Sequence, residues 1–352
     1  MAKMENLFPE FYLKELTSSD LKTNNLIVLD SNILLDVLRL PNAVSKKYME
    51  AIEKSKKSIF IPYIVGLEFN FNKKETKIRT KQDLEKYEER ISESIEKLKD
   101  KILDLNFLRH KNKKKEISQK LTDEIENYFP KLDTFIKDKV YPVIHEEYSD
   151  DLDIRTRELV NLLGESIADI LTQEWIDKVQ EEGKARYIAS IPPGYNDEKS
   201  KVSKGIPDKR QYSGLEYETQ YGDYIEWEEI LHKVSKDGMN YGDKVIWVTN
   251  DGDSNTKNDI YYRYGHEKIG PHIYLLNELT TLRYGYDIIN SNKKRATCPE
   301  EATNKQLYII NGFRFMELAN ELTKEEVYTD AIKVQEYNEE LRSLNQEIED
   351  LN

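Results

Sequence analysis

The sequence predicts an α/β fold in which a parallel sheet is flanked by helices, with a long α-helical insertion and a helical C-terminal tail. Three observations support this prediction. A short aliphatic run at residues 26–30 leads directly into an apolar helical run, and a second strand-like run follows at 58–62. From about residue 72 to residue 190 the chain is charged, has helical periodicity and offers no strand candidate. A strand–helix–strand–helix order needs crossover connections, which are typical of parallel sheets.

Composition narrows the class of protein. The chain has 352 residues, of which 38% are hydrophobic and 34% charged, so a folded core with solvated helices is expected. The net charge of −13 argues against a protein that coats nucleic acid, because phosphate affinity comes mainly from Lys and Arg. The single cysteine, Cys298, cannot form an internal disulfide. With no signal-peptide pattern and no apolar run of about 20 residues, the protein is expected to be cytoplasmic and without a membrane segment.

The first half of the chain contains the start of the predicted sheet. Residues 26–30 have the short, almost wholly aliphatic pattern of a buried parallel strand, and an apolar helical run follows. An amphipathic helix is expected at 45–57, a second strand at 58–62, and helix again at 63–71.

The middle of the chain predicts a helical insertion, because each of its helices has one apolar face that must pack on another element. The boundaries expected are a split α/β sheet domain at 1–71 and 191–300, a helical insertion at 72–190 and a C-terminal helical extension at 301–352. The apolar stripes are Ile91, Ile95, Leu98, Ile102 and Leu105; Leu121, Ile125, Phe129, Leu132 and Phe135 or Ile136; and Leu159, Leu162, Leu163, Ile167, Ile170 and Leu171.

The strand–helix alternation resumes after the Pro- and Gly-rich link at 191–195, whose prolines exclude a helix interior. Residues 196–220 are polar and Lys-rich and predict an ordered loop or a mobile flap. A helix is expected at 223–234, and the clearest strand of the chain at 244–249. The acidic tail ends in a 4-3 apolar pattern at 341–351, which favours a partner-docking or capping helix.

Four carboxylates are candidate functional groups. Asp30 and Asp251 follow strand-like runs, at the edge where open α/β sheets bind ligands. Glu68 and Asp223 lie on helical segments. Each has a structural alternative. Asp30 can cap a helix, and Glu68 can be a solvated helix residue. Asp223 can interact favourably with the dipole of its helix, and Asp251 can belong to a turn.

The four acids are more informative as a set. Carboxylates that converge on one crevice raise one another's pKa unless a divalent cation neutralises them. Mg²⁺ suits such a site because it is a hard ion held by few carboxylates and several waters. Two such ions about 4 Å apart can activate a water and stabilise a leaving oxygen. The set therefore favours metal-dependent hydrolysis of a phosphodiester.

These residues resemble the PIN-domain nucleases, and most closely the large bacterial PIN-like group that has a helical insertion. The resemblance spans residues 8 to 280 and includes the opening strand with Asp30 and Asn32. Glu68, Asp223 and Asp251 match the second, third and fourth acidic positions, with Asn32, Thr249 and Asn250 as supporting neighbours. The resemblance implies Mg²⁺- or Mn²⁺-dependent cleavage of RNA rather than DNA, as in a toxin or an anti-phage effector.

The sequence departs from the group after its last acid. Residues 252–256 intervene before Lys257-Asn258-Asp259-Ile260, so Asp253 competes with Asp251 or assists it, and the position of Asp259 is open. The tail beyond about residue 300 is not explained by the resemblance.

Candidate substrate contacts are basic residues near the acids, together with aromatic residues that can stack bases or be buried. The denser basic cluster at 109–115 ranks below them. The residues near the acids are Lys199, Lys201, Lys204, Lys209, Arg210 and Lys257, with the aromatics Tyr212, Tyr217, Tyr221 and Tyr224.

Two other functions compete. One is a non-catalytic PIN-like scaffold that binds a protein or RNA partner; in either case an inhibitor or partner protein is expected on the helical insertion or the C-terminal helix. The other is a phosphatase with an Asp nucleophile, against which Asn32 stands where a second acid is needed. The sequence leaves the oligomeric state open.

Overall fold

The computed structural model describes residues 4, 8, 11–107, 109–196, 207–252, 259–264, 267–290, 293–323 and 326. Its core is a parallel sheet, as predicted, and the sheet has four strands in the order β2-β1-β5-β8. Every residue of β1 is buried, which explains its wholly aliphatic sequence. The strands are β1 Leu26–Leu29, β2 Ile59–Phe60, β5 Lys244–Val248 and β8 Gln306–Ile310.

Strand register determines which chain ends meet at the edge of the sheet. Leu29 of β1 is paired with Val248 of β5, and Val248 is paired with Ile310 of β8. The residues that follow these strands therefore lie side by side. This edge brings Asp30 next to Thr249 and the turn after it.

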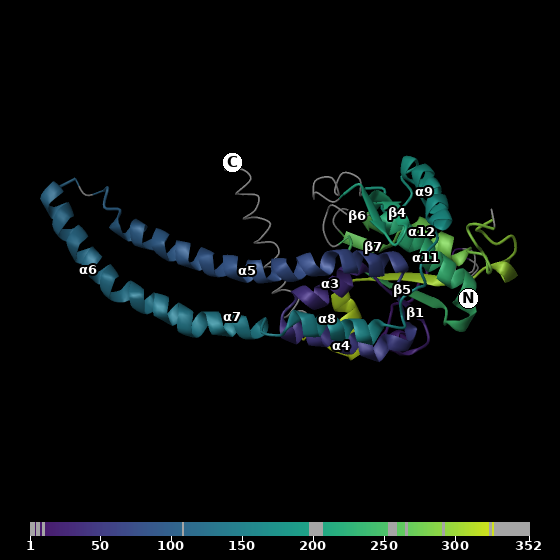
Figure 1. Ribbon diagram of the computed structural model, residues 1–352, viewed down its shortest axis with the longest axis horizontal. Coiled ribbons are helices and arrows are strands. Elements are labelled where there is room, and N and C mark those ends of the chain that lie inside the picture. Colours follow the sequence, from purple (N-terminus) through teal and green to yellow (C-terminus); the bar gives the residue numbers. More distant parts are fainter. Residues whose placement is uncertain are drawn as a thin grey trace.

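Helices cover both faces of the sheet (Figure 1). One layer contains α4 and α8, and the other contains α9, α11 and α12. The bounds are α2 Ser18–Lys22, α3 Ser31–Arg39, α4 Asn42–Ser55, α8 Leu152–Leu163, α9 Gln173–Ile188, α11 Gly222–Asp237, α12 Ile273–Thr280 and α13 Gly312–Asn320. Within the described residues, no helix is both long and apolar enough to cross a membrane.

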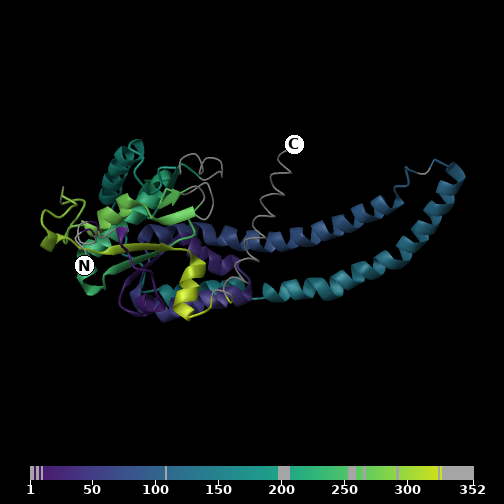
Figure 2. The same ribbon diagram turned by 180° about the vertical axis from the view of Figure 1, so that it is seen from behind.

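A long helical arm projects from the sheet domain (Figures 1 and 2). Its outgoing helix α5, Tyr63–Leu103, has 41 residues, or about 60 Å at 1.5 Å per residue. The chain returns through α6 Lys111–Phe135, the π-helical turn Ile136–Val140 and α7 Tyr141–Glu147. The helical insertion predicted from the sequence is confirmed. However, α5 runs without a break through the expected boundary at residue 72, so one continuous helix joins the site to the arm.

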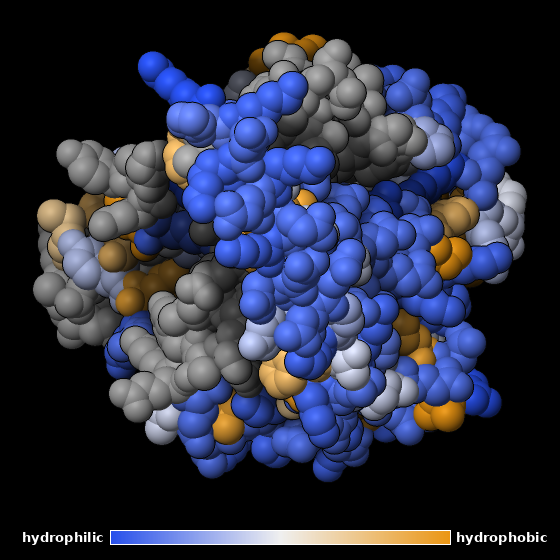
Figure 3. Space-filling model, turned by 90° about the vertical axis from the view of Figure 1, so that its left-hand side faces the viewer, coloured by the Kyte–Doolittle hydropathy of each residue, from blue (hydrophilic) through white to orange (hydrophobic). Residues whose placement is uncertain are grey.

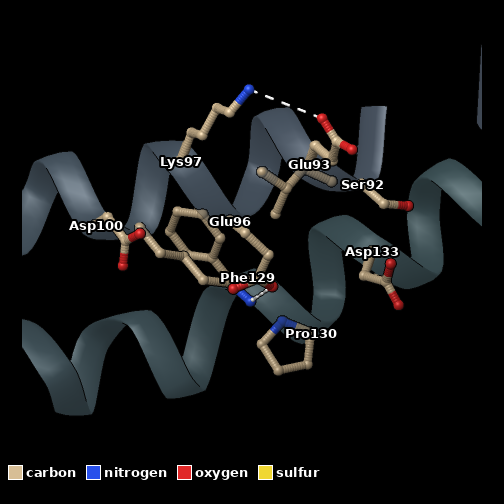
Figure 4. A pocket seen from close by; sticks show the side chains of 10 residues that line it. Ser92, Glu93, Glu96, Lys97, Asp100, Phe129, Pro130 and Asp133 are labelled. Atoms are coloured by element: carbon tan, nitrogen blue, oxygen red, sulfur yellow. Dashed lines mark hydrogen bonds and ion pairs between the residues drawn. The ribbon is translucent and has the colours of Figure 1, made fainter. Parts of the chain in front are cut away.

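The predicted apolar stripes of the arm are only partly closed. Leu105 and Ile125 are buried, whereas Leu98 and Leu132 are 47% and 38% exposed. Phe129 lies between the two helices in a cleft of about 660 Å³ that is otherwise lined mainly by polar residues (Figure 4). Seen with the arm tip toward the viewer, the surface is mainly hydrophilic with separate hydrophobic patches (Figure 3). The arm is thus a solvated helical pair and not a hydrophobic core of its own.

The predicted start of a C-terminal helical extension at residue 301 is wrong. Residues 306–310 form β8, an integral strand of the sheet, and α13 packs on α4. The physical reason is the apolar run Leu307-Tyr308-Ile309-Ile310, which completes the sheet beside β5. The 4-3 pattern at 341–351 lies outside the described residues.

Two antiparallel hairpins were not anticipated. β3 Lys209–Tyr212 and β4 Leu215–Glu218 lie in the segment predicted as a loop or flap, of which residues 197–206 are outside the described part. The turn residues Ser213 and Gly214 both have positive φ, at 52° and 83°, as the type I′ turn of a two-residue hairpin requires. The second hairpin is β6 Tyr261–Tyr264 and β7 Glu267–Pro271.

Candidate active site

Asp30 is the first residue after β1 and caps the N-terminus of α3. Its carboxylate accepts hydrogen bonds from the Ser31 backbone N–H, from Asn32 Nδ2 at 2.5 Å and from Thr249 Oγ1 at 2.6 Å. The side chain is buried, with 6% of the residue exposed. The helix-cap role and the position at the sheet edge, which the sequence left as alternatives, are therefore both present.

Asn32, Thr249 and Asn250 join the ends of β1 and β5. Asn32 Nδ2 donates to Thr249 Oγ1 at 3.2 Å, and Asn32 Oδ1 accepts from the Asn250 backbone N–H at 3.1 Å. Thr249 Oγ1 also accepts from the Asp251 backbone N–H at 3.0 Å. The three supporting residues predicted from the sequence thus hold Asp30 and the Asp251 turn in one hydrogen-bonded unit.

Glu68 approaches this unit from α5. Its Oε2 accepts a hydrogen bond from Ser31 Oγ at 3.1 Å. The backbone N–H groups of Tyr63 and Ile64, at the start of the same helix, donate to the buried Glu229 carboxylate of α11 at 2.6 and 3.0 Å. A carboxylate at this end satisfies otherwise unpaired N–H groups and the helix dipole. Glu229 therefore fixes the helix end that carries Glu68.

Asp223 is the second residue of α11 and is half-buried. The link at 191–195 lies against it, because a Cβ on Gly194 would be 3.2 Å from the Asp223 Cβ. Gly194 has φ +89°, which a side chain would strain. Its backbone N–H donates to Asp259 Oδ2 at 2.6 Å, so Asp259, whose place the sequence left open, anchors the link beside Asp223.

Electrostatics connects the four predicted acids. Burial, and then repulsion from Asp251, Asp223 and Glu68, raise the pKa of Asp30 from its ordinary 3.8 to about 7, although the Thr249 hydrogen bond opposes this shift. Carboxylates influence one another in this way only at close range. The structure therefore brings Asp30, Glu68, Asp223 and Asp251 into one neighbourhood.

Glu226 is a fifth acid that sequence reasoning missed. It is buried, and burial followed by repulsion from Asp30, Asp223 and Glu68 raises its pKa well above the ordinary value. Its Oε1 accepts from Trp247 Nε1 of β5 at 2.8 Å. The available signal was its position three residues after Asp223, since residues at this spacing share a helix face.

The site has the chemistry of a hard-cation site. Its donors are carboxylate oxygens, which Mg²⁺ and Mn²⁺ prefer, and a cation offsets the repulsion that raises the pKa of Asp30. In the described part of the chain, no group of three or more Asp, Glu, His or Cys side chains is arranged to hold a metal ion. The acids therefore suit a divalent cation in their chemistry and in their proximity. Binding the cation requires their side chains to move closer together.

The predicted substrate contacts lie in different parts of the structure. Arg210 turns toward α5, whereas Lys209 is on the other face of β3, paired with Glu216 at 2.7 Å. Tyr217, Tyr221 and Tyr224 are buried, and Tyr212 is exposed. The 109–115 cluster lies at the far end of the arm. Lys199, Lys201, Lys204, Lys257 and Asp253 are outside the described residues.

The fold and the site define a class: α/β proteins with carboxylates gathered at the carboxyl edge of a parallel sheet. A family model described as a PIN-like domain matches residues 26–275, which span β1 to α12 and include all four acids. The chain belongs to this PIN-like domain family. PIN-like domains are generally nucleases that hydrolyse phosphodiester bonds, and they typically use divalent metals. Neither the curated proteins nor the solved structures contain a significant match.

Proposed function

We propose that this protein is a metal-dependent endoribonuclease that hydrolyses RNA phosphodiester bonds. The observation that supports this most directly is the position of Asp30, which is buried at the end of β1, accepts hydrogen bonds from Asn32 and Thr249, and lies close enough to Asp251, Asp223 and Glu68 for their charges to raise its pKa. If the site only stabilised the fold, removing one of these charges would increase the stability of the protein, because the carboxylates repel one another. Retaining them in proximity costs stability unless a cation is bound.

In this proposal Asp30, Glu68, Asp223 and Asp251 hold Mg²⁺ or Mn²⁺, with Asp253 as an additional candidate ligand. The bound metal supplies an activated water and stabilisation of the leaving oxygen. The protein's own groups do the positioning. Thr249 and Asn32 orient the Asp30 carboxylate, and Ser31 orients Glu68.

The substrate is proposed to be RNA in single strands or loops, as the family resemblance implies. The same resemblance suggests a cytoplasmic toxin or anti-phage effector, held inactive by an inhibitor or partner protein on the arm or the C-terminal segment. Induced expression of the protein is then expected to arrest growth, and expression of Asp30→Asn is not. RNA from both cultures, sequenced at its new ends, identifies the cleavage sites.

Purified protein tests the activity itself. Labelled single-stranded RNA and DNA of one sequence are incubated with Mg²⁺, Mn²⁺ or EDTA, using wild type, Asp30→Asn and Asp251→Asn, with Glu93→Gln in the exposed arm as a carboxylate control. We expect cleavage of RNA that needs metal, survives Glu93→Gln and falls at least about 100-fold in both Asp variants. Cleavage that persists in both Asp variants contradicts the proposal.

A second candidate function is a PIN-like scaffold without activity. The observation that favours it is the lack, among the described residues, of three side chains already placed around one ion. A scaffold would show no stabilisation by Mn²⁺, which separates the two functions without an RNA substrate.

A further inference from the structure

Next to Glu68, α5 and the β3–β4 hairpin form a small exposed aromatic surface. Phe71 and Asn72 follow Glu68 by three and four residues, so they lie on its side of the helix, about 5–6 Å further along. Arg210 and Tyr212 of β3 cover this turn. The Arg210 guanidinium lies 4.9 Å from the Phe71 ring centre, and the Tyr212 ring lies 6.4 Å from it, edge to face.

The alternation of side chains along β3 explains why these two residues face α5. Lys209 and Gln211 lie on the opposite face, where both bind Glu216. Arg210 is directly across from Tyr217, which is buried. The hairpin thus places the Lys209–Glu216 ion pair on one face and Arg210 and Tyr212 on the other face, toward α5.

The hairpin is held firmly by α9. Gln173 donates to the Glu216 carbonyl at 2.9 Å and accepts from the Glu216 N–H at 2.7 Å. Gln180 Oε1 accepts from the Glu218 N–H at 2.6 Å. The aromatic surface is therefore supported by a fixed strand.

Exposure distinguishes this surface from the core. Phe71 is 39% exposed and Tyr212 is 56% exposed, whereas Tyr217, the third residue of β4, is 1% exposed. Arg210 donates to Asn72 Oδ1 at 3.3 Å, and no carboxylate pairs with it within the described residues. Two exposed rings and a cation not paired with a carboxylate suit a base and the phosphate next to it.

We propose that Phe71, Tyr212 and Arg210 form a stacking platform for one nucleobase of a single strand whose phosphodiester backbone continues to the acids. This inference rests on the proposed function, because it assigns the platform to the substrate of that site. Stacking is sequence-tolerant, since every base has an aromatic face. The platform thus contributes to binding single strands and not to reading a sequence.

The test uses a single-stranded oligonucleotide that contains 2-aminopurine, whose fluorescence is quenched when it stacks. Binding is measured with the full chain in an Asp30→Asn background to prevent cleavage. Phe71→Ala and Tyr212→Ala are expected to weaken binding about 5- to 100-fold and to remove the quenching. Tyr212→Phe keeps both, because the ring remains.

Tyr128→Ala is the matched control. Tyr128 is 59% exposed and has Lys131 4.9 Å from its ring centre, but it lies on α6 in the arm. Its removal is expected to leave affinity and quenching unchanged. Equal binding and quenching in Phe71→Ala, Tyr212→Ala and Tyr128→Ala overturns the platform, as does a lack of binding to single strands. If Phe71→Ala lowers the melting temperature, the binding and quenching of Tyr212→Ala decide the outcome, because Tyr212 is more exposed than Phe71.

A small diester, bis(p-nitrophenyl) phosphate, separates the platform from the catalytic proposal. Its Mn²⁺-dependent hydrolysis by the otherwise unsubstituted protein is expected to be the same in the Tyr128→Ala variant, whereas KM for RNA is expected to rise in the Tyr212→Ala variant. Ring-dependent quenching without hydrolysis of either substrate supports the platform and contradicts the nuclease. Hydrolysis with ring-independent binding supports the nuclease and contradicts the platform.

Discussion

Thr249 Oγ1 donates a 2.6 Å hydrogen bond to Asp30 Oδ2 and so ties the end of β5 to the end of β1. The same hydroxyl oxygen accepts from the Asp251 backbone N–H at 3.0 Å. One threonine therefore fixes the distance between two acids that repel each other. The bond to Asp30 crosses from β5 to β1 and therefore depends on strand register, whereas the bond from Asp251 is made within the turn that follows β5.

The raised pKa of Asp30 predicts a stability that depends on pH. In the unfolded chain this carboxyl has its ordinary pKa of 3.8, and in the folded protein about 7, so the folded state binds more protons between these values. Stability is then expected to fall as pH rises from about 4 to above 7, by roughly 4 kcal/mol at 1.4 kcal/mol per unit. Asp30→Asn removes this part of the dependence.

Denaturant unfolding in EDTA at pH 5 and pH 8 measures the effect. Other groups titrate in the same range, Glu229 among them with a pKa raised by burial to about 8, but they are common to both proteins. The difference between wild type and Asp30→Asn isolates Asp30. Parallel pH profiles of the two proteins would contradict a buried, repelled carboxylate at this position.

Divalent metal is expected to reverse this destabilisation. Mn²⁺ binds the ionised carboxylates, so it should raise the melting temperature of wild type more at pH 8 than at pH 6. A concentration 100-fold above Kd adds about 2.7 kcal/mol. Asp251→Asn should reduce the rise, whereas Glu93→Gln in the arm should not. If millimolar Mn²⁺ leaves the melting temperature unchanged at pH 8, the scaffold function is favoured over the nuclease.

The parts of the fold that the sequence predicted are those with local signals. The aliphatic run of β1 and the acid after it are contiguous. One short segment was therefore enough to predict both the strand and the position of Asp30 at the edge of the sheet. The arm followed from its periodicity. β8 was missed because its partner strand β5 lies 62 residues earlier in the chain and an acidic segment follows β8.

The hairpins and Glu226 were missed for a different reason. β3 has three exposed residues of four, so it lacks the apolar alternation that identifies strands. Glu226 is surrounded by other acids on α11, and only the rotation of that helix against the sheet turns it toward Trp247. Such orientation is a tertiary property, which a helical pattern alone does not supply.

Glu226 predicts a contrast between two substitutions. Glu226→Gln keeps an acceptor for the Trp247 indole N–H and removes a buried acid with repelling neighbours, so stability at pH 8 should be unchanged or higher. Glu226→Leu leaves that buried N–H without its partner and should cost about 1–3 kcal/mol. Denaturant unfolding followed by tryptophan fluorescence measures both, since Trp247 stacks on Trp227 with ring centres 5.8 Å apart. Equal losses in the two variants would show that the hydrogen bond is unimportant.

Substitutions of Asn250 are expected to show how strongly the site depends on the helices α3 and α13, which Asn250 contacts. Its Nδ2 donates to Asp36 Oδ2 of α3 at 2.5 Å, and its Oδ1 accepts from the Gly312 N–H of α13 at 3.0 Å. Asn250→Ala loses both bonds and should lower stability by about 1–3 kcal/mol. Asn250→Asp keeps the Gly312 bond but sets two carboxylates together, so its loss should be larger at pH 8 than at pH 4, where protonation relieves the repulsion.

Urea unfolding at the two pH values tests this prediction, and Asn290→Ala is the matched control. Asn290 also donates to an aspartate, Asp287 at 2.8 Å, but in an exposed turn. Its removal is expected to change stability by no more than about 0.5 kcal/mol. If Asn250→Asp is as stable as wild type at pH 8, Asn250 does not couple α3 and α13 to the end of β5. In that case the hydrogen bonds among Asp30, Asn32 and Thr249 hold the edge on which the acids lie.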